Sequence, residues 1–406
     1  MTDRRPVIIV GGGPAGMVCG FLLARAGLRV TVLEKHRDFL RDFRGDTIHP
    51  ATMELFHELG LLDEFLTRPH ARIDMASVDV MGRSYRVASL RHLPVAAPFI
   101  AMMPQWDFLD FVAQQARAFP GFDLRMETEA SAPLFDEQGR VSGVRLASGE
   151  ALEARLVIAA DGRRSVIREA AALPLEDLGA PMDVLWFRIP RPAGKALQEV
   201  PLGSIGPDGM VIAIPRGDYW QCAKLIEKGT IEAVRARGID LFRREVAAIT
   251  PALADSIGAI QSFDEVKLLS VALDRLTKWH RPGLLAIGDA AHAMSPVAGV
   301  GVNLAVQDAV AAANILAAPL AEGHNPDPLL ADVQARRWTP TVRIQALQRA
   351  AHRRVIEPML RGEVTRAPFA LRLLDRLPLL RRVPGRIIGL GFGRQHVESP
   401  RAGPPA

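Results

Sequence analysis

The chain has 406 residues but only two cysteines, Cys19 and Cys222. Two isolated thiols provide neither a disulfide framework nor a cysteine-rich metal cluster, so we expect no metal site and a reducing, cytoplasmic location. The sequence also lacks a run of 18 apolar residues, and its N-terminus lacks a basic region followed by an apolar core. We therefore expect a soluble, unprocessed protein.

Concentrated positive charge is also missing from most of the chain. The net charge is +5, and the basic residues are mostly arginines scattered among acids, without the interleaved aromatic residues of a nucleic-acid surface. A nucleic-acid partner is therefore not expected. Hydrophobic residues make up 49% of the chain, which supplies a large core for two domains or one elaborated domain.

The most informative stretch that is present covers residues 7–34. Four apolar residues are followed by the loop Gly11-Gly12-Gly13-Pro14-Ala15-Gly16, a helical pattern and a second apolar strand. In such a strand–helix–strand unit Gly11 permits the tight turn, Gly13 lets the backbone approach a pyrophosphate, and Gly16 allows close packing of helix on strand. The helix N-terminus presents unpaired N–H groups to the phosphates. The pattern predicts a dinucleotide site.

Glu34 ends the second strand, 23 residues after Gly11. A carboxylate at this place can accept hydrogen bonds from an adenosine ribose and would repel a 2′-phosphate. FAD or NAD is therefore favoured over NADP as the ligand of this motif.

The rest of the chain predicts an α/β protein with an inserted, mainly antiparallel sheet. The expected elements are an amphipathic helix over 51–66 broken at Gly60, a hairpin over 73–89, a helix over 108–118, an antiparallel meander over 124–153, a strand-rich region over 180–274 with one helix near 232–247, and a long helix over 303–316.

Acid-and-glycine turns follow three of the expected strands: Glu34, Asp161-Gly162 and Gly288-Asp289. Ligands of a parallel sheet lie at the carboxyl ends of its strands, so these turns could converge on one long cofactor. After the third turn, Gly299, Gly301 and Asn303 mark the start of a helix. Its N–H groups can face the N1–C2=O edge of a reduced flavin, whose negative charge the helix dipole stabilises.

With these motifs the sequence resembles the single-component flavin aromatic hydroxylases, which include para-hydroxybenzoate hydroxylase and the ubiquinone-pathway hydroxylases. The resemblance spans residues 6 to about 345 and includes Ser165, Arg168 and Asp308. It implies a Rossmann-like FAD-binding domain formed by residues 1–72, 97–180 and 275–345. It further implies a substrate-binding sheet domain over 73–96 and 181–274 and a C-terminal helical segment over 346–406.

The resemblance also assigns cofactor contacts. The Asp161-Gly162 turn would serve FAD and the nicotinamide, Asp289 would hold the ribityl chain, and Arg44 would lie near the flavin phosphates or the nicotinamide nucleotide. Two residues depart from the family pattern, because Gln105 stands where many members have an arginine and Val300 replaces a common glutamine. The expected cofactor-binding residues are Gly11, Gly13, Pro14, Ala15, Gly16, Glu34, Lys35, Arg44, Gln105, Asp161, Gly162, Gly288, Asp289, Pro296, Gly299, Val300, Gly301, Val302 and Asn303.

Candidates for a catalytic role are His49, Tyr219 and Pro296. His49 stands in a loop expected to line the flavin, although it could instead cap the helix that begins near Pro50. Tyr219 lies in a strand that could face the substrate, although aromatic residues in strands more often pack. With only Tyr85 and Tyr219 in the chain, we cannot place a paired-tyrosine relay. His292 is expected to be a structural residue of its turn.

The C-terminal stretch 366–394 contains seven arginines and one acid, Asp375, interleaved with leucine and isoleucine. This pattern is typical of a helix packed on its own protein or of a peripheral membrane-surface helix. Pro378 and Pro384 should break it into short pieces.

The expected function is an FAD-dependent monooxygenase. NADH or NADPH would reduce the FAD, O2 would form a C4a-hydroperoxyflavin, and its distal oxygen would pass to an aromatic or quinone-like small molecule. One alternative is an FAD-dependent reductase of a polyprenyl or unsaturated substrate on the same fold, and another is a non-catalytic flavin-binding protein. The sequence leaves a homodimer open.

Overall fold

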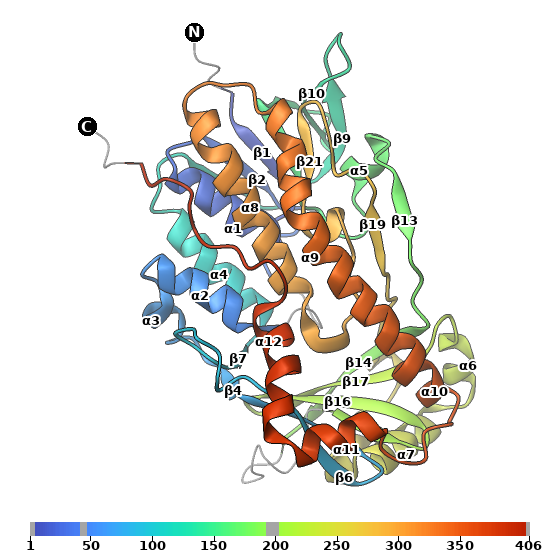
Figure 1. Ribbon diagram of the computed structural model, residues 1–406. Coiled ribbons are helices and arrows are strands. Elements are labelled where there is room, and N and C mark those ends of the chain that lie inside the picture. The colour runs from blue at the N-terminus through green and yellow to red at the C-terminus, as the bar shows by residue number, and fades with distance from the viewer. Residues whose placement is uncertain (1–4, 41–46, 192–202, 403–406) are drawn as a thin grey trace.

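The computed structural model describes residues 5–40, 47–191 and 203–402. Its central layer is a six-stranded sheet in which five strands run parallel, and all of these except the edge strand β8 (Phe122–Arg125) are fully buried (Figure 1). The strand order is β20 (His280–Arg281), β21 (Leu284–Ala286), β12 (Leu156–Ala159), β1 (Val7–Val10), β2 (Val30–Leu33) and β8 (Phe122–Arg125), with only β20 antiparallel. Strands buried on both faces explain the continuous apolar runs of the sequence.

Apolar helices cover this sheet. They are α1 (Pro14–Arg25), α4 (Gln105–Ala116) and α8 (Gly301–Ala321), whose buried residues share one core with the strands. The helix expected over 108–118 therefore begins earlier, at Gln105. The segment Val297–Ala321 has the length and composition to cross a membrane, but 72% of its apolar window is buried inside the protein. Here it serves as a core helix.

The antiparallel meander is shorter than predicted. Residues 122–125 pair in parallel with β2, which the sequence did not indicate because four residues carry too little periodicity. The meander contains β9 (Ala130–Phe135), β10 (Val141–Leu146) and β11 (Ala151–Glu153).

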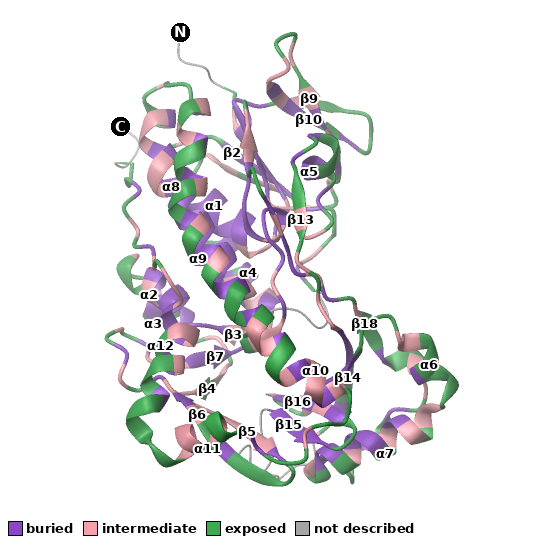
Figure 2. Ribbon diagram, turned by 45° about the vertical axis from the view of Figure 1, so that its right-hand side comes forward, coloured by how far each residue is buried: buried purple, intermediate pink, exposed green. Residues whose placement is uncertain are grey.

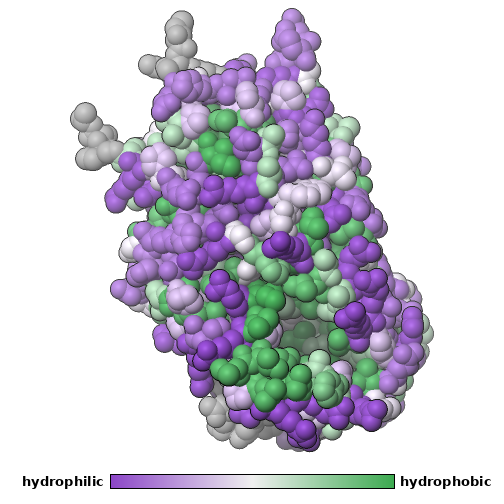
Figure 3. All heavy atoms as spheres, viewed as in Figure 1, coloured by the Kyte–Doolittle hydropathy of each residue, from purple (hydrophilic) through white to green (hydrophobic). Residues whose placement is uncertain are grey.

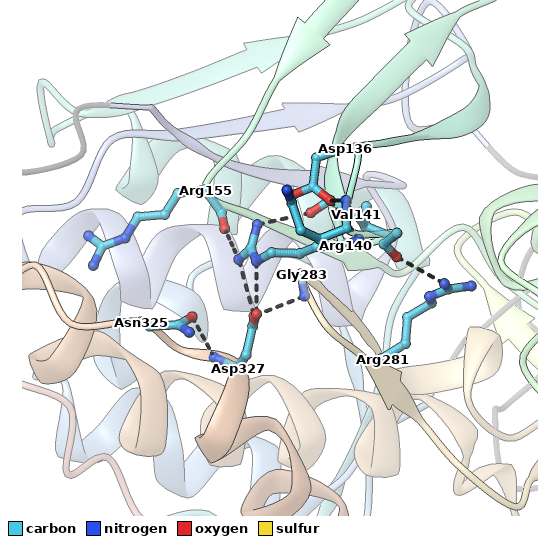
Figure 4. Close-up of polar contacts among 10 residues, drawn as sticks. Asp136, Arg140, Val141, Arg155, Arg281, Gly283, Asn325 and Asp327 are labelled. Carbon is cyan, nitrogen blue, oxygen red and sulfur yellow. Dashed lines mark hydrogen bonds and ion pairs between the residues drawn. The ribbon is translucent and has the colours of Figure 1, made fainter.

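An ion pair joins the meander to the turn between α8 and the next helix (Figure 4). The Arg140 guanidinium donates two hydrogen bonds to the Asp327 carboxylate, at 2.8 and 3.1 Å, and a third to the backbone oxygen of Arg155. Asp327 also accepts the amide of Gly283, which precedes β21. The cluster fixes the N-terminal end of β21 relative to the helical layer.

A seven-stranded sheet forms the second layer, with α7 (Ile239–Ile249) on one face and C-terminal helices on the other (Figure 1). Its order is β18 (Lys267–Leu269), β14 (Met182–Pro190), β17 (Tyr219–Glu227), β16 (Gly209–Arg216), β15 (Gly203–Gly206), β5 (Met75–Val80) and β6 (Arg83–Ser89). The hairpin β5–β6 turns at Met81-Gly82 as predicted. The single helix expected near 232–247 is two helices, α6 (Ile231–Ala236) and α7, because Gly238 separates them.

Smaller elements connect the two sheets. The smaller elements are β3 (Thr47–Ile48), α2 (Pro50–Glu58), α3 (Leu62–Phe65), β4 (Ala71–Ile73), β7 (Ile100–Met102), α5 (Val166–Ala170), β13 (Leu175–Asp177) and β19 (Asp274–Leu276). Of these, α2 and α3 come from the amphipathic stretch 51–66 and separate at Gly60, as predicted.

The chain from residue 330 onward packs on both sheets. Its helices are α9 (Leu330–Ala351), α10 (Glu357–Leu360), α11 (Phe369–Arg376) and α12 (Arg382–Leu390). Helix α9 passes through residue 346, where the sequence suggested a boundary. Pro378 separates α11 from α12, but Pro384 does not break the helix, because it lies in the first turn of α12, where the backbone N–H that proline lacks would have no intrahelical acceptor. Figure 2 shows exposed faces along α9 and α11.

Candidate active site

Three loops meet at the carboxyl edge of the parallel sheet. Gly11 follows β1 and lies so close to the end of β12 that a Cβ atom there would be 2.4 Å from the Ala160 backbone oxygen. Gly288 follows β21, and its Cβ would be 2.9 Å from the Ala15 side chain of α1. The loops after β1, β12 and β21 thus lie side by side at this edge, as convergence of the acid-and-glycine turns on one cofactor requires.

The glycine loop has the geometry of a phosphate cradle. Gly11 has a φ of 107°, which favours glycine, and a Cβ on Gly16 would be 1.9 Å from the Gly11 oxygen. A Cβ on Gly13, in contrast, would meet no atom within 4 Å among the described residues. Gly13 is also the N-cap of α1 and makes no side-chain cap. The loop therefore leaves open space in front of the helix N-terminus, where a pyrophosphate can lie.

Glu34 is buried beside this loop. Its carboxylate accepts the Gly12 amide at 3.1 Å and the His36 amide at 3.0 Å. These bonds fix the side chain, and an ionised carboxylate has about four acceptor positions in all. Glu34 can accept the two hydroxyls of a ribose from this position.

Asp161 has a buried carboxylate oxygen, Oδ1, without a hydrogen-bond partner among the described residues. Its other oxygen accepts the Ile167 amide at 3.4 Å. Burial raises the pKa of Asp161, although hydrogen bonds from Ser165 and nearby amides oppose the rise. A buried acceptor that lacks a hydrogen-bond donor costs free energy. The Asp161 Oδ1 is therefore placed to accept a hydrogen bond from a group outside the described residues.

The Gly288-Asp289 turn rests on a buried charged cluster. The Asp308 carboxylate accepts the Gly288 amide at 3.1 Å, the His292 Nε2 at 2.6 Å and the Arg337 Nε at 2.7 Å. All three side chains of the cluster are at most 1% exposed. Asp289 itself is half-buried in the same turn. His292 is thus the structural residue that we expected.

The loop before α8 is backbone-strained. Ala298 has a φ of 65° and Gly299 one of 62°, and a left-handed conformation is unfavourable for alanine. The Gly299 oxygen accepts the Thr47 hydroxyl at 3.0 Å, and the Asn303 side chain accepts the Thr52 hydroxyl at 2.9 Å. These contacts hold the first turn of α8, whose N–H groups have no intrahelical acceptors.

His49 lies behind this loop and is fully buried. Its Nδ1 is 2.7 Å from the backbone oxygen of Ile388 in α12, whereas its Nε2 has no partner among the described residues. Burial lowers the pKa of His49 against weaker opposing hydrogen bonds, so the ring is neutral. His49 stands at the N-cap position of α2 but makes no side-chain cap.

The remaining candidates are less informative. Lys35 is exposed and lies 4.0 Å from Glu129, Gln105 is a buried first residue of α4, and Arg44 lies outside the described residues. Tyr219 begins β17 with the Arg188 guanidinium 5.0 Å from its ring centre. Its neighbour Trp220 is in the core on the opposite face, as expected for packing. Pro296, Val300 and Val302 lie in or next to the α8 loop.

Taken together, these features fit FAD. The gap at Gly13 suits the pyrophosphate, Glu34 suits the ribose, and the orphan oxygen of Asp161 and the start of α8 suit the flavin half. The family model described as an FAD binding domain matches residues 4–346. The chain belongs to the single-component FAD-dependent aromatic hydroxylases.

Known members of this hydroxylase family match most of the chain. The 6-methylpretetramide 4-monooxygenase of Streptomyces rimosus is 32% identical over 94% of this chain and 91% of its own length. The rifampicin monooxygenase of Streptomyces venezuelae is 29% identical over 82% of this chain and 67% of its own. The structure of PqsL from P. aeruginosa in complex with 2-aminobenzoylacetate shares the fold at 24% identity with a TM-score of 0.75, and covers 88% of this chain and 97% of that one.

The hydroxylase is accordingly an FAD-dependent monooxygenase, for which NADH or NADPH is the typical electron donor. Sequence reasoning missed Arg337 and Thr52 as supports of the cofactor turns. Arg337 is 29 residues from Asp308 in a helix with no motif of its own, so no sequence signal could have paired them.

Substitution of Glu34 is expected to act on cofactor affinity. Glu34→Ala should raise the dissociation constant of FAD roughly 10- to 150-fold, because a lost hydrogen bond to a charged group costs about 1.5–3 kcal/mol. Fluorescence titration of the apoprotein measures the constant. The exposed Glu150 at a distant turn offers a matched control, Glu150→Ala. Unchanged affinity in Glu34→Ala would show that this carboxylate does not bind the ribose.

Proposed function

We propose that the protein hydroxylates an aromatic or quinone-like small molecule, with aromatic polyketides as the first class to test. The overall reaction converts substrate, O2, NAD(P)H and a proton into hydroxylated product, NAD(P)+ and water. Bound FAD, reduced by the nicotinamide, supplies the activation of oxygen. Both relatives are named as monooxygenases, which supports hydroxylation, and neither name favours the reductase alternative.

The observation that carries the proposal is the position of the α8 loop. Val297 in this loop packs against an apolar cluster on one face of the seven-stranded sheet, which includes Val184, Ile214, Ala223 and Leu225. The flavin half of the site therefore adjoins a buried apolar cluster through Val297. An apolar wall of this kind favours a flat ring over water.

The surface is open near this place. Figure 3 shows a hollow, bordered by hydrophobic residues, between α12 and the end of α9 and α10, and Figure 1 places the loop before α8 next to it. We assign this hollow to substrate entry. Water exclusion matters here, because oxygen activated in a wet site leaves as hydrogen peroxide instead of reaching the substrate.

His49 and Tyr219 remain proposals for roles near the substrate. The neutral His49 ring donates through Nδ1 to Ile388, so its Nε2 can only accept a hydrogen bond. We expect the protein in the cytoplasm.

The proposal predicts a yellow protein with about one non-covalent FAD per chain. NADH and NADPH oxidation should be stimulated by some members of a panel of phenols, quinolones and aromatic polyketides. Product, oxygen uptake and peroxide are measured in the same reaction.

Each outcome separates the candidate functions. Product formation with matching oxygen uptake supports the hydroxylase. Reduction of a substrate under anaerobic conditions would instead establish a reductase. FAD binding with no nicotinamide oxidation for any substrate of the panel would favour a role in binding alone.

A further inference from the structure

The corner between α11 and α12 exposes large hydrophobic side chains. Phe369 is 70% exposed, Leu379 69% and Val383 61%. Two further leucines of the corner, Leu377 and Leu380, are 46% and 38% exposed. Figure 3 shows hydrophobic residues gathered over α11 and α12. Scattered single apolar residues need no explanation, but a group on one corner marks an interaction site.

Exposed arginines surround this apolar corner. Arg372 and Arg376 lie three and seven residues after Phe369, on the same side of α11. Arg382 and Arg386 are exposed on α12 beside Val383. The only acid between residues 366 and 394, Asp375, accepts the Arg86 amide at 3.2 Å and lies 3.4 Å from its guanidinium. The surface is therefore strongly positive. We call the exposed side chains of residues 366–386 the α11–α12 surface.

The inward side of the same helices is fixed to the protein. Ala367 and Leu390 are buried in the apolar cluster of the seven-stranded sheet, and Leu371 packs against it. The buried Arg381 donates to the Leu374 backbone oxygen at 2.8 Å, which closes the corner between the helices. Within residues 5–40, 47–191 and 203–402, the outward hydrophobic side chains therefore sit on helices that are fixed to the protein, and they have no further face of the chain to pack against.

We propose that the α11–α12 surface docks the protein onto an anionic phospholipid membrane. The corner would enter the boundary between headgroups and acyl chains, while the arginines reach lipid phosphates from long side chains. Charge complementarity favours this partner over a second copy of the chain. A two-fold symmetric contact would place the same arginines against one another.

Flotation with lipid vesicles tests the proposal on the FAD-loaded full chain. Vesicles of phosphatidylglycerol and phosphatidylcholine should carry the protein, and pure phosphatidylcholine vesicles should carry much less. Binding to the anionic vesicles should weaken as salt rises. Arg382→Gln with Arg386→Gln should weaken binding about 25-fold, at about fivefold per arginine. Leu379→Ser with Val383→Ser should weaken it at least about tenfold.

Matched variants keep the result specific. Leu175→Ser with Leu268→Ser removes two leucines that are 46% and 44% exposed on other elements, and Arg117→Gln with Arg244→Gln removes two exposed arginines elsewhere. These controls should bind vesicles like the parent chain, and FAD content and melting temperature show that all variants fold. The proposal is wrong if the parent chain does not bind anionic vesicles. It is also wrong if the variants of the α11–α12 surface bind these vesicles as strongly as the control variants do. If the parent chain does not bind vesicles but forms a dimer, and the variants of the α11–α12 surface dissociate that dimer, the surface serves self-association instead.

Discussion

Asp308→Ala is expected to lower the free energy of unfolding by about 3–5 kcal/mol and to deprive the purified protein of FAD. The change leaves the Arg337 guanidinium buried at 1% exposure without its carboxylate, and an uncompensated buried charge is costly. It also removes the acceptor of the Gly288 amide, which positions the turn that carries Asp289. Stability and cofactor binding therefore fall together.

The same cluster makes stability depend on pH. Burial opposes the charge of Asp308, but attraction to His292 and Arg337 and the hydrogen bonds from both outweigh it, so the Asp308 pKa lies below its ordinary value. A carboxyl whose pKa is lower in the folded state stabilises the fold above the unfolded-state pKa, near 3.9. This contribution is lost as the pH falls from there through the lower folded-state pKa. Asp308→Asn should flatten that acid limb.

Urea unfolding at several pH values, with absorbance of bound flavin, measures both effects. Asp332→Ala provides the control, because Asp332 is exposed on α9, the helix that also carries Arg337. That variant should change stability by less than about 1 kcal/mol and retain FAD. If Asp308→Ala were as stable as the control, the cluster would not support the turn.

The sequence was informative where local spacing determines structure. The glycine loop, Glu34 and the Gly288 turn each carry their signal within a few residues, and the parallel sheet then brings them together because all follow strands of one direction. Contacts that depend on distant packing were not readable. Thr52 and Asn303 are 251 residues apart, and His49 contacts Ile388 across 339 residues. No pattern in either segment specifies the partner.

The C-terminal segment shows the same limit. Its amphipathic composition left packing and membrane contact as alternatives, and the structure shows that one side packs while the other stays exposed. After α12 the chain returns along the FAD-binding layer, where the Val397 amide donates to Glu58 and the Ser399 amide to Asn314. These single polar contacts have no periodicity, so sequence reasoning could not place them.

Asp289→Ala is expected to weaken FAD binding roughly 10- to 150-fold and to divert electrons from product to hydrogen peroxide. Asp289 follows β21 directly, in the turn that Asp308 holds by the Gly288 amide, so its carboxylate has a defined position at the sheet edge. If it binds the ribityl chain, its loss lets the flavin shift relative to the α8 loop. The apolar wall near Val297 then no longer excludes water from the reacting oxygen.

Three measurements on one preparation separate this role from a structural one: melting temperature, FAD dissociation constant and peroxide formed per NAD(P)H. The exposed Asp240 gives the control, Asp240→Ala, which should match the parent chain in all three. Asp289→Asn keeps a hydrogen-bonding side chain and should recover part of the affinity and of the coupling. A ribityl contact predicts weaker FAD and more peroxide at nearly unchanged apoprotein melting. If the apoprotein of Asp289→Ala melts at a lower temperature while FAD affinity and coupling stay normal, Asp289 only stabilises its own turn. A side chain that binds the ribityl chain would instead change affinity and coupling when it is removed.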